Sequence, residues 1–332
     1  MKSIKEIILL FLVLFSFLGL VSNSVVFRSY IYQQKTVKDM NYVQPRLSLD
    51  EAKKLDLSYP NINIYVVPFK THLGRVYLRD SMYKDAIASF HRARKINPFL
   101  LINENYLAET YLSINELDSF KFYARKIFNK APNHPGHFAF YIKSLDSLQN
   151  SKKIDSAFNT INVKSTKIWK IYLASIYNTG TIKEQAERNI KIADSIYKKN
   201  KEIQYIIDAI RYGGDNIEKS DELIGVADAI AKVGDFEGSI KVLKKALELY
   251  PTSNSIYDKI ATSYFKISMN DSSLKYINKI DLSKYENPGR YFLIKGINLV
   301  KLDKKEEGCQ ALYQSIILGD KEAVKANRSF CN

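Results

Sequence analysis

The chain has 332 residues, of which 46% are hydrophobic, so it carries enough apolar material for an extended core. Glycine and proline are sparse, at 13 and 8 residues, which favours helices and argues against a β-sandwich, whose short strands need frequent turns. The net charge is +15, from 50 Lys and Arg against 35 Asp and Glu. The lysines are spread along the chain without a dense basic block, which is typical of solvated helix faces and argues against a nucleic-acid partner.

The first predicted element in chain order is an apolar segment over residues 7–27. Lys2 and Lys5 precede it, and a charged start followed by an apolar run is the layout of a secretory signal. Ser22 and Ser24 fit the small-residue positions of a cleavage site. Without cleavage, the segment is long enough to span a bilayer once. The sequence therefore predicts a signal peptide or an uncleaved anchor, with the bulk of the chain exported to the extracytoplasmic (periplasmic) side, and the length of the apolar run favours the anchor.

A juxtamembrane connector is predicted over residues 28–66. Within it, Ser48 and Glu51 have the spacing of a capping box, which predicts a short helix over 49–56. Residues 59–61, Tyr-Pro-Asn, predict a turn.

After the connector, a pattern of small and large residues recurs, in places 34 residues apart. The copy that ends at Pro98 shows it most fully. Its small residues let the two helices of a hairpin approach closely, its aromatic residues fill the space between hairpins, and its proline ends the second helix. The positions in this copy are Leu73, Gly74, Tyr77, Ala86, Phe90, Ala93 and Pro98.

Five further copies keep this phase, and residues 135–166 predict a shortened hairpin between two of them. The positions are Leu107, Ala108, Tyr111, Ala124, Ile127 and Pro132; Leu173, Ala174, Tyr177, Ala186, Ile190 and Ala193; Val226, Ala227, Ile230, Ser239, Leu243, Ala246 and Pro251; Ile260, Ala261, Tyr264, Ser273 and Ile277; and Gly296, Leu299, Gly308 and Leu312.

This pattern resembles the tetratricopeptide repeat (TPR). The resemblance implies an all-α fold, a right-handed TPR solenoid of antiparallel helical hairpins, preceded by the N-terminal transmembrane or signal helix. The expected parts are the signal or anchor in 1–27, the connector in 28–66, a TPR sub-array in 67–200, an extra helix and linker in 201–219, a second sub-array in 220–320 and a capping helix in 321–332.

TPR arrays hold extended partner segments in a concave groove lined by the first helix of each hairpin. Projecting the repeat phase onto these helices predicts a groove of mixed charge. The Lys/Asn set with which some TPR proteins clamp a terminal carboxylate is not among its residues. The predicted binding residues are Arg75, Arg79, Asn105, Glu109, Asn178, Asp228, Lys232, Asp258, Thr262 and Lys266.

Cys309 and Cys331 are the only cysteines. If the last hairpin helix and the cap are antiparallel, the two lie side by side within reach of a disulfide, which would fit an oxidising compartment; the alternative is two buried thiols. His134 and His137 have no nearby Cys or carboxylate pair, so they are interpreted as loop residues and no metal site is predicted. No catalytic motif is present, so we expect neither enzyme activity nor a cofactor.

Residues 59–180 are also similar, through loose motifs, to the periplasmic TPR tail of some bacterial O-antigen ligase/polymerase proteins. The motifs include Asp-Ser-Phe-Lys-Phe-Tyr-Ala at 118–124 and Ile-Trp-Lys-Ile-Tyr-Leu-Ala at 168–174. The multi-span catalytic domain of that family is absent, so its activity is not implied. We therefore expect a non-enzymatic, membrane-tethered scaffold for protein partners in the bacterial cell envelope. The alternatives are an accessory of surface-polysaccharide ligation or polymerisation, in contact with the glycan-assembly machinery, and an RNA- or polyanion-binding repeat protein.

Overall fold

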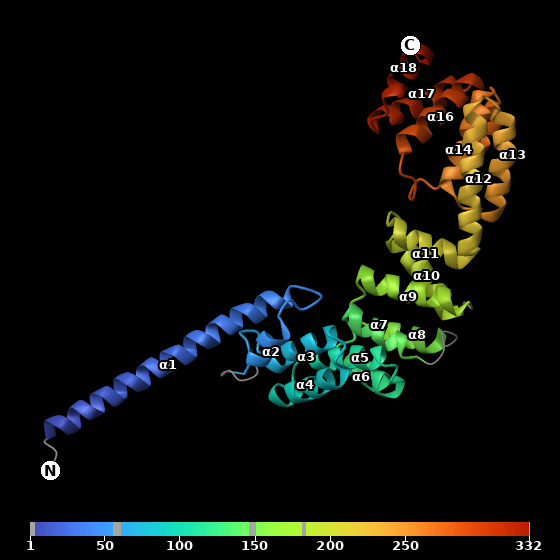
Figure 1. The fold of residues 1–332 in the computed structure, drawn as a ribbon. Helices are drawn as coiled ribbons and strands as arrows, with labels where there is room; N and C mark the ends of the chain where they lie inside the picture. Colours follow the sequence, from blue (N-terminus) through green and yellow to red (C-terminus); the bar gives the residue numbers. More distant parts are fainter. Residues whose placement is uncertain (1–3, 56–60, 146–150, 181–183, 332) are drawn as a thin grey trace. The chain divides into compact units, whose positions relative to one another are not determined.

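The structure, a computed structural model, describes residues 4–55, 61–145, 151–180 and 184–331 (Figure 1). In these ranges the regular structure is helical, apart from one isolated β-bridge between Ile62 and Pro68. The predicted all-α fold class is therefore confirmed. The chain forms two compact units, residues 1–171 and 172–332.

The first helix, α1 (Ile4–Met40), joins two segments that the sequence analysis separates. Its apolar half has a mean hydropathy of 2.3 over an 18-residue window, and none of that window is buried. The helix then continues through residues 28–40, which were predicted to belong to a connector. This difference has a simple cause, because no glycine or proline occurs between Gly19 and Pro45 to interrupt the helix.

The second half of α1 packs against the beginning of the repeat array. Ser29, Thr36 and Asp39 lie along one buried stripe at helical spacing. Tyr32 of the same half packs against a core cluster that draws on α2 (Leu49–Leu55) and α3 (Phe69–Arg79). The buried members of that cluster are Leu47, Ala52, Leu55, Phe69, Leu73 and Val76.

Helix α2 begins with the predicted capping box. The backbone N–H of Glu51 donates to the hydroxyl of Ser48 at 3.2 Å, and the backbone N–H of Ser48 donates to the Glu51 carboxylate at 3.1 Å. These bonds satisfy backbone donors that a helix start leaves unpaired. The predicted helix is thereby confirmed, whereas the turn predicted at 59–61 falls almost entirely outside the described residues.

Successive helical hairpins follow in the first unit. Packing of small residues against aromatic rings joins the first two, in a core that includes Ala86, Phe90, Leu107, Ala108 and Phe120. The hairpin helices are α3 with α4 (Tyr83–Ile96), α5 (Ile102–Ser113) with α6 (Leu117–Lys130), and α7 (Pro135–Lys143) followed by α8 (Ser151–Asn159).

The second unit begins within α9 and ends with the cap. Its helices are α9 (Thr166–Thr179), α10 (Glu184–Ile196), α11 (Lys201–Tyr212), α12 (Gly214–Lys232), α13 (Phe236–Leu249), α14 (Asn254–Lys266), α15 (Asn270–Ile277), α16 (Pro288–Lys301), α17 (Lys305–Ile317) and α18 (Lys321–Phe330). The extra helix predicted in 201–219 corresponds to α11, which ends at Gly213 with a φ of +86°. Helix α12 starts directly after it, at Gly214, rather than at residue 220.

Four hairpins have the same backbone turn, so these repeats resemble one another in main-chain structure as well as in their side chains. In each, one residue adopts a left-handed conformation, and the next N–H donates to the carbonyl five residues before it, as in a Schellman motif. The left-handed residues have φ values of 59–62°. The four bonds are Met82 to Tyr77, Glu116 to Tyr111, Met269 to Tyr264 and Lys304 to Leu299, at 2.8–3.0 Å.

Close approach of the hairpin helices can be tested at Gly74. A Cβ atom there would lie 2.5 Å from the Phe90 ring, so Gly74→Leu should lower the free energy of unfolding by about 1–3 kcal/mol through overpacking. Ala227→Leu, at a fully buried position, should act similarly. Gly225→Leu is the matched control, because a Cβ at Gly225 meets nothing within 4 Å. Thermal melting would check this, and a Gly74→Leu curve identical to that of the unmodified chain would contradict the packing.

Candidate binding site

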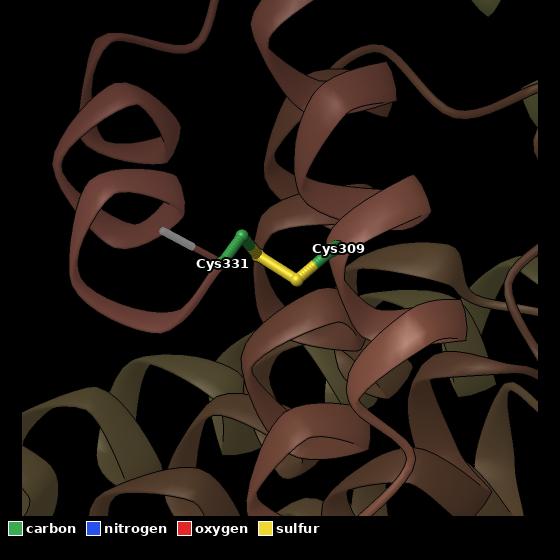
Figure 2. The surroundings of a disulfide bond; sticks show 2 residues. All are labelled: Cys309 and Cys331. Atoms are coloured by element: carbon green, nitrogen blue, oxygen red, sulfur yellow. A yellow bond between two sulfur atoms is a disulfide. The ribbon is translucent and has the colours of Figure 1, made fainter.

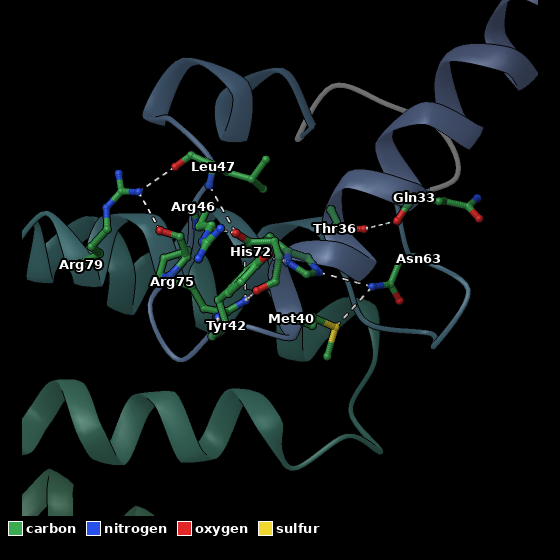
Figure 3. Close-up of polar contacts among 12 residues, drawn as sticks. Gln33, Thr36, Met40, Tyr42, Arg46, Leu47, Asn63, His72, Arg75 and Arg79 are labelled. Atoms are coloured by element: carbon green, nitrogen blue, oxygen red, sulfur yellow. Dashed lines mark hydrogen bonds and ion pairs between the residues drawn. The ribbon is translucent and has the colours of Figure 1, made fainter.

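The predicted groove residues Arg75 and Arg79 lie on α3, where they bind a segment of the chain itself. This segment, residues 41–47, is called the strap; it links α1 to α2 and runs beside α3 (Figure 3). The two arginine side chains donate hydrogen bonds to main-chain carbonyl oxygens in and next to the strap. Both arginines are therefore already in use as peptide-binding groups.

Arg75 joins the end of α1 to α3 through a buried ion pair. Its Nη1 lies 3.0 Å from Oδ2 of Asp39, and its Nη2 donates to the carbonyl oxygen of Tyr42 at 2.8 Å. The Arg75 and Asp39 side chains are 5% and 2% exposed. The other oxygen of Asp39 accepts the backbone N–H groups of Arg46 and Leu47 at 2.6 and 3.2 Å. One carboxylate thus fixes the strap at its far end and α3 at once.

Arg79, one helical turn further on, holds the rest of the strap. Its Nη1 donates to the carbonyl oxygens of Pro45 and Leu47, at 3.0 and 2.7 Å. Its Nε and Nη2 form a bidentate pair with the neighbouring carboxylate of Asp80. Main-chain recognition of this kind is independent of the side chains of the strap.

His72 lies between this ion pair and the loop before α3. The side-chain oxygen of Asn63 accepts two backbone N–H groups, from Tyr65 and Val67, so its amide nitrogen must face Nε2 of His72, 3.3 Å away. Nε2 is therefore the acceptor, and the proton sits on Nδ1, which lies 3.9 Å from Oδ2 of Asp39. Burial lowers the pKa of His72, with a smaller opposing effect from Asp39, so the ring is neutral in the folded protein near pH 7.

A cavity of about 800 Å³ opens between the strap and the first two hairpins. Residues of the strap form one wall, while α3, α5 and Tyr83 of α4 form the others. Its lining residues are Met40, Asn41, Tyr42, Val43, Gln44, Pro45, Arg75, Leu78, Arg79, Tyr83, Tyr106, Glu109 and Ser113. The cavity therefore brings together three of the predicted binding residues, Arg75, Arg79 and Glu109.

Glu109 differs from the two arginines because its side chain is exposed in the cavity wall. Among the residues that the structure describes, its carboxylate has no hydrogen-bond or ion-pair partner. Surrounding protein raises the pKa of Glu109, and the nearby charge of Arg75 opposes that effect. Glu109 is thus the predicted residue here with free binding capacity.

Other polar residues of the array connect the first helices of successive hairpins. In the first unit, the Thr71 hydroxyl donates to Asn103 at 2.8 Å, and the predicted binding residue Asn105 lies 3.1 Å from Nε2 of His137. Nδ1 of His137 bonds to the carbonyl oxygen of Ala131 at 3.1 Å. Both nitrogen atoms of His137 are therefore engaged within the protein.

The same kind of link occurs in the second unit. Lys259 bonds to both carboxylate oxygens of Asp228, at 2.8 and 2.9 Å. Arg290 bonds to Asp258 at 3.2 Å and to Thr262 at 2.8 Å. Three predicted binding residues are thus paired with the next hairpin, whereas Asn178, Lys232 and Lys266 are exposed.

The loop between α15 and α16 contacts α10, which also bonds to α11. Lys284 of this loop bonds to Asp194 at 2.5 Å, although the two are 90 residues apart in the sequence. Arg211 of α11 shares the same carboxylate at 3.0 Å. These contacts hold α11, the helix that falls outside the hairpin pattern, within the second unit.

The two cysteines form a disulfide that links α17 to the end of α18 (Figure 2). Their Cα atoms lie 5.7 Å apart, and the closed loop spans 22 residues. The cap that α18 provides is thereby attached covalently to the last hairpin.

Several residues of these networks escaped the sequence analysis. Asp39 was assigned to a connector, and His72 was not among the predicted binding residues. Lys259 and Arg290 lie 31 and 32 residues after their acidic partners, close to one repeat length. Opposite charges at that offset were therefore a usable signal for these two, whereas no comparable signal marks Asp39.

No protein-family model matches the sequence, and no curated protein matches it. Similar solved structures include a TPR protein from Parabacteroides merdae, with 14% identity over 93% of this chain and 98% of that chain and a TM-score of 0.31. The TPR2AB domain of yeast Sti1 in its pHSP90 complex has 14% identity over 78% of this chain and 93% of that chain, with a TM-score of 0.29. The pilF protein of Pseudomonas aeruginosa has 14% identity over 85% of this chain and 99% of that chain, with a TM-score of 0.26.

At these TM-scores the similar structures support no conclusion about the function of this protein. Its fold is defined by its own structural features. Its helical hairpins, the small residues between their helices and the shared turns define it as a TPR solenoid. The similarity of residues 59–180 to O-antigen ligase tails finds no support among the matches and stays a hypothesis.

The two arginines give a matched test of the α1 attachment. Arg75→Leu should cost about 3–5 kcal/mol of stability, because it leaves the buried Asp39 carboxylate without its cation. Arg79→Leu should cost less, because it removes bonds to neutral carbonyl groups from a partly exposed side chain. Thermal melting and hydrogen exchange of the Arg46 and Leu47 amides would measure both effects. Equal losses for the two variants would contradict a dominant role of the ion pair.

The buried histidine predicts the direction of a pH effect. Because the folded-state pKa of His72 lies below its ordinary value of 6.5, the unfolded chain takes up a proton that the folded chain does not as the pH falls below about 6.5. Stability should therefore be constant near pH 7–8 and decline toward pH 5, by at most about 1.4 kcal/mol per pH unit for one such group. His72→Gln should flatten this decline in denaturant titrations. Burial also lowers the pKa values of His91 and His137, so these two residues would still contribute to the decline of stability with falling pH in this variant.

Proposed function

We propose that this protein is a non-enzymatic scaffold, tethered to a membrane by residues 7–27, that holds a protein partner in the bacterial cell envelope. The observation that carries the proposal is the make-up of α1. One half of this helix is apolar and wholly exposed, while the other half is docked on the repeat array through Asp39 and Arg75.

The exposed half of α1 needs an apolar environment. Large hydrophobic side chains such as Leu9, Phe15 and Leu20 are 65–73% exposed, and burial of such a side chain is worth about 1.5–3 kcal/mol. Soluble monomers seldom expose contiguous apolar patches beyond a few hundred Å². A single bilayer-spanning helix would supply the missing burial over its whole circumference.

The disulfide between Cys309 and Cys331 supports a location outside the cytoplasm. Disulfides persist in oxidising compartments such as the bacterial periplasm and are rare in the cytosol. With this end of the chain outside, the short N-terminus lies on the cytoplasmic side. The proposed topology is therefore N-terminus inside and repeat array outside.

A binding role for the array follows from its surface chemistry. The described residues contain no group of three or more His, Cys, Asp or Glu side chains placed to hold a metal ion. Some charged side chains on the first helices of the hairpins, such as Asp228 and Asp258, are paired with the next hairpin. What the first unit offers to a partner is a cavity with main-chain, aromatic and carboxylate groups on its walls, which suits recognition of another polypeptide.

Fractionation and crosslinking of the full chain in native cells would test the proposal. The chain should stay in the membrane pellet after an alkaline wash, and a variant with Leu10, Leu14 and Leu18 changed to Arg should not. Photo-crosslinking in membranes should capture envelope proteins. A multi-span glycan polymerase among them would favour the accessory role in polysaccharide assembly. Capture of ribosomal or nucleoid proteins alone, or free thiols at Cys309 and Cys331 under native alkylation, would refute the envelope location.

A further inference from the structure

The loop between α15 and α16 departs from the usual contact pattern of a solenoid. In a repeat array each repeat contacts only its neighbours. Here Nζ of Lys284 donates to Oδ1 of Asp194 on α10 at 2.5 Å, although α11 and two complete hairpins, α12 with α13 and α14 with α15, lie between the two residues in the chain. The second unit therefore contains a closed ring of helices, which runs from α10 to the loop and back to α10.

A second ion pair attaches the same loop two residues further on. Nζ of Lys201, the first residue of α11, lies 2.6 Å from Oε1 of Glu286. Near the other end of α11, Arg211 donates to the second oxygen of Asp194 at 3.0 Å. Both ends of α11 are therefore linked to the closure of the ring, one through Glu286 and the other through Asp194.

The loop supplies a charge that the helices around Asp194 lack. A second carboxylate, that of Asp208 on α11, accepts the hydroxyl of Tyr250 at 2.5 Å. Burial raises the pKa values of Asp194 and Asp208, whereas Lys284 and Arg211 lower them, so both cations act on both carboxylates. With the two carboxylates ionised, the four charges balance when Lys284 is in place. Without Lys284, the two carboxylates share a single cation.

Different forces hold the two sides of the loop. Towards α14 and α16 the attachment is apolar, because Ile280 is 6% exposed and Tyr285 packs against the core cluster to which Ile280 belongs. Towards α10 and α11 the attachment consists of the ion pairs, whose side chains are 20–81% exposed. Exposed ion pairs contribute little stability and weaken as salt screens them. The ring can therefore open at the ion pairs while the hairpins stay folded.

We infer that this loop, residues 278–287, is an ion-pair clasp that holds the second unit closed at low ionic strength and releases α10 and α11 as the salt concentration rises. The inference goes beyond the proposed scaffold function and does not depend on it, because it concerns only contacts within the second unit. Closure fixes the curvature of this unit, and release lets α10 and α11 move away from the loop.

Pulsed electron paramagnetic resonance of the full chain in an uncharged detergent tests the clasp. Spin labels are attached to Ile196→Cys at the end of α10 and to Leu282→Cys in the loop, two exposed positions. The native cysteines are bonded to each other and stay unlabelled. At about 0.01 M salt, where the screening length is about 30 Å, the labels should give one short and narrow distance distribution. At about 1 M salt, where that length is about 3 Å, the distribution should become longer and broader.

Asp194→Ala in the labelled chain should lose the short distance already at low salt, because Lys284 and Arg211 lose the carboxylate that they share. Asp228→Ala is the matched control. It makes the same change in an ion pair, with Lys259 at 2.8 Å, that joins neighbouring hairpins and takes no part in closing the ring. This control should keep the short distance at low salt. Circular dichroism should show that Asp194→Ala keeps its helical content.

Three results would overturn the inference. A distance distribution that is the same at both salt concentrations and in Asp194→Ala would show that the ion pairs do not hold the loop. An equal loss of the short distance in Asp228→Ala would show that the effect is not specific to the clasp. Loss of the short distance only together with loss of helical content would show that the ring opens by unfolding.

Discussion

The buried carboxylate of Asp39 is the constraint on which the arrangement of the first unit depends. A carboxylate removed from water is tolerated only when its charge and its lone pairs are satisfied. Here one oxygen accepts two backbone N–H groups of the strap and the other accepts Arg75. The same contacts therefore set the end of α1, the course of the strap and the position of α3. The cavity beside the strap exists because these three elements are held in place.

Polar side chains elsewhere in the array follow a related rule. Links such as Asp228 to Lys259 and Asp258 to Arg290 connect one hairpin to the next, so these charges help to hold successive repeats in register. Such pairs contribute little stability when exposed, but they remove free charge from the inner surface. Lys232 and Lys266 of the second unit stay exposed beside these pairs, and Glu109 of the first unit has no ion-pair partner among the described residues.

The fold was largely predictable because its determinants are local and periodic. Small residues such as Gly74 and Ala227 recur in phase, and the capping box at Ser48 needs only three residues of sequence. The length of α1 was missed because apolar composition, rather than helix propensity, was used to place its end. The Asp39–Arg75 pair was missed because it joins residues 36 positions apart across the boundary between a non-repeating segment and the first repeat, where no periodicity relates them.

The uninterrupted course of α1 has a mechanical consequence. A helix advances about 1.5 Å and turns about 100° with each residue, and α1 contains no glycine or proline after Gly19 at which rotation would be absorbed. If residues 8–27 lie in a bilayer, the number of residues between the apolar half and Asp39 sets the orientation of the attached repeats. This orientation is their rotation about the membrane normal. A rotation of α1 about its axis, or a shift along it, would accordingly move the repeats packed against its second half as a rigid body.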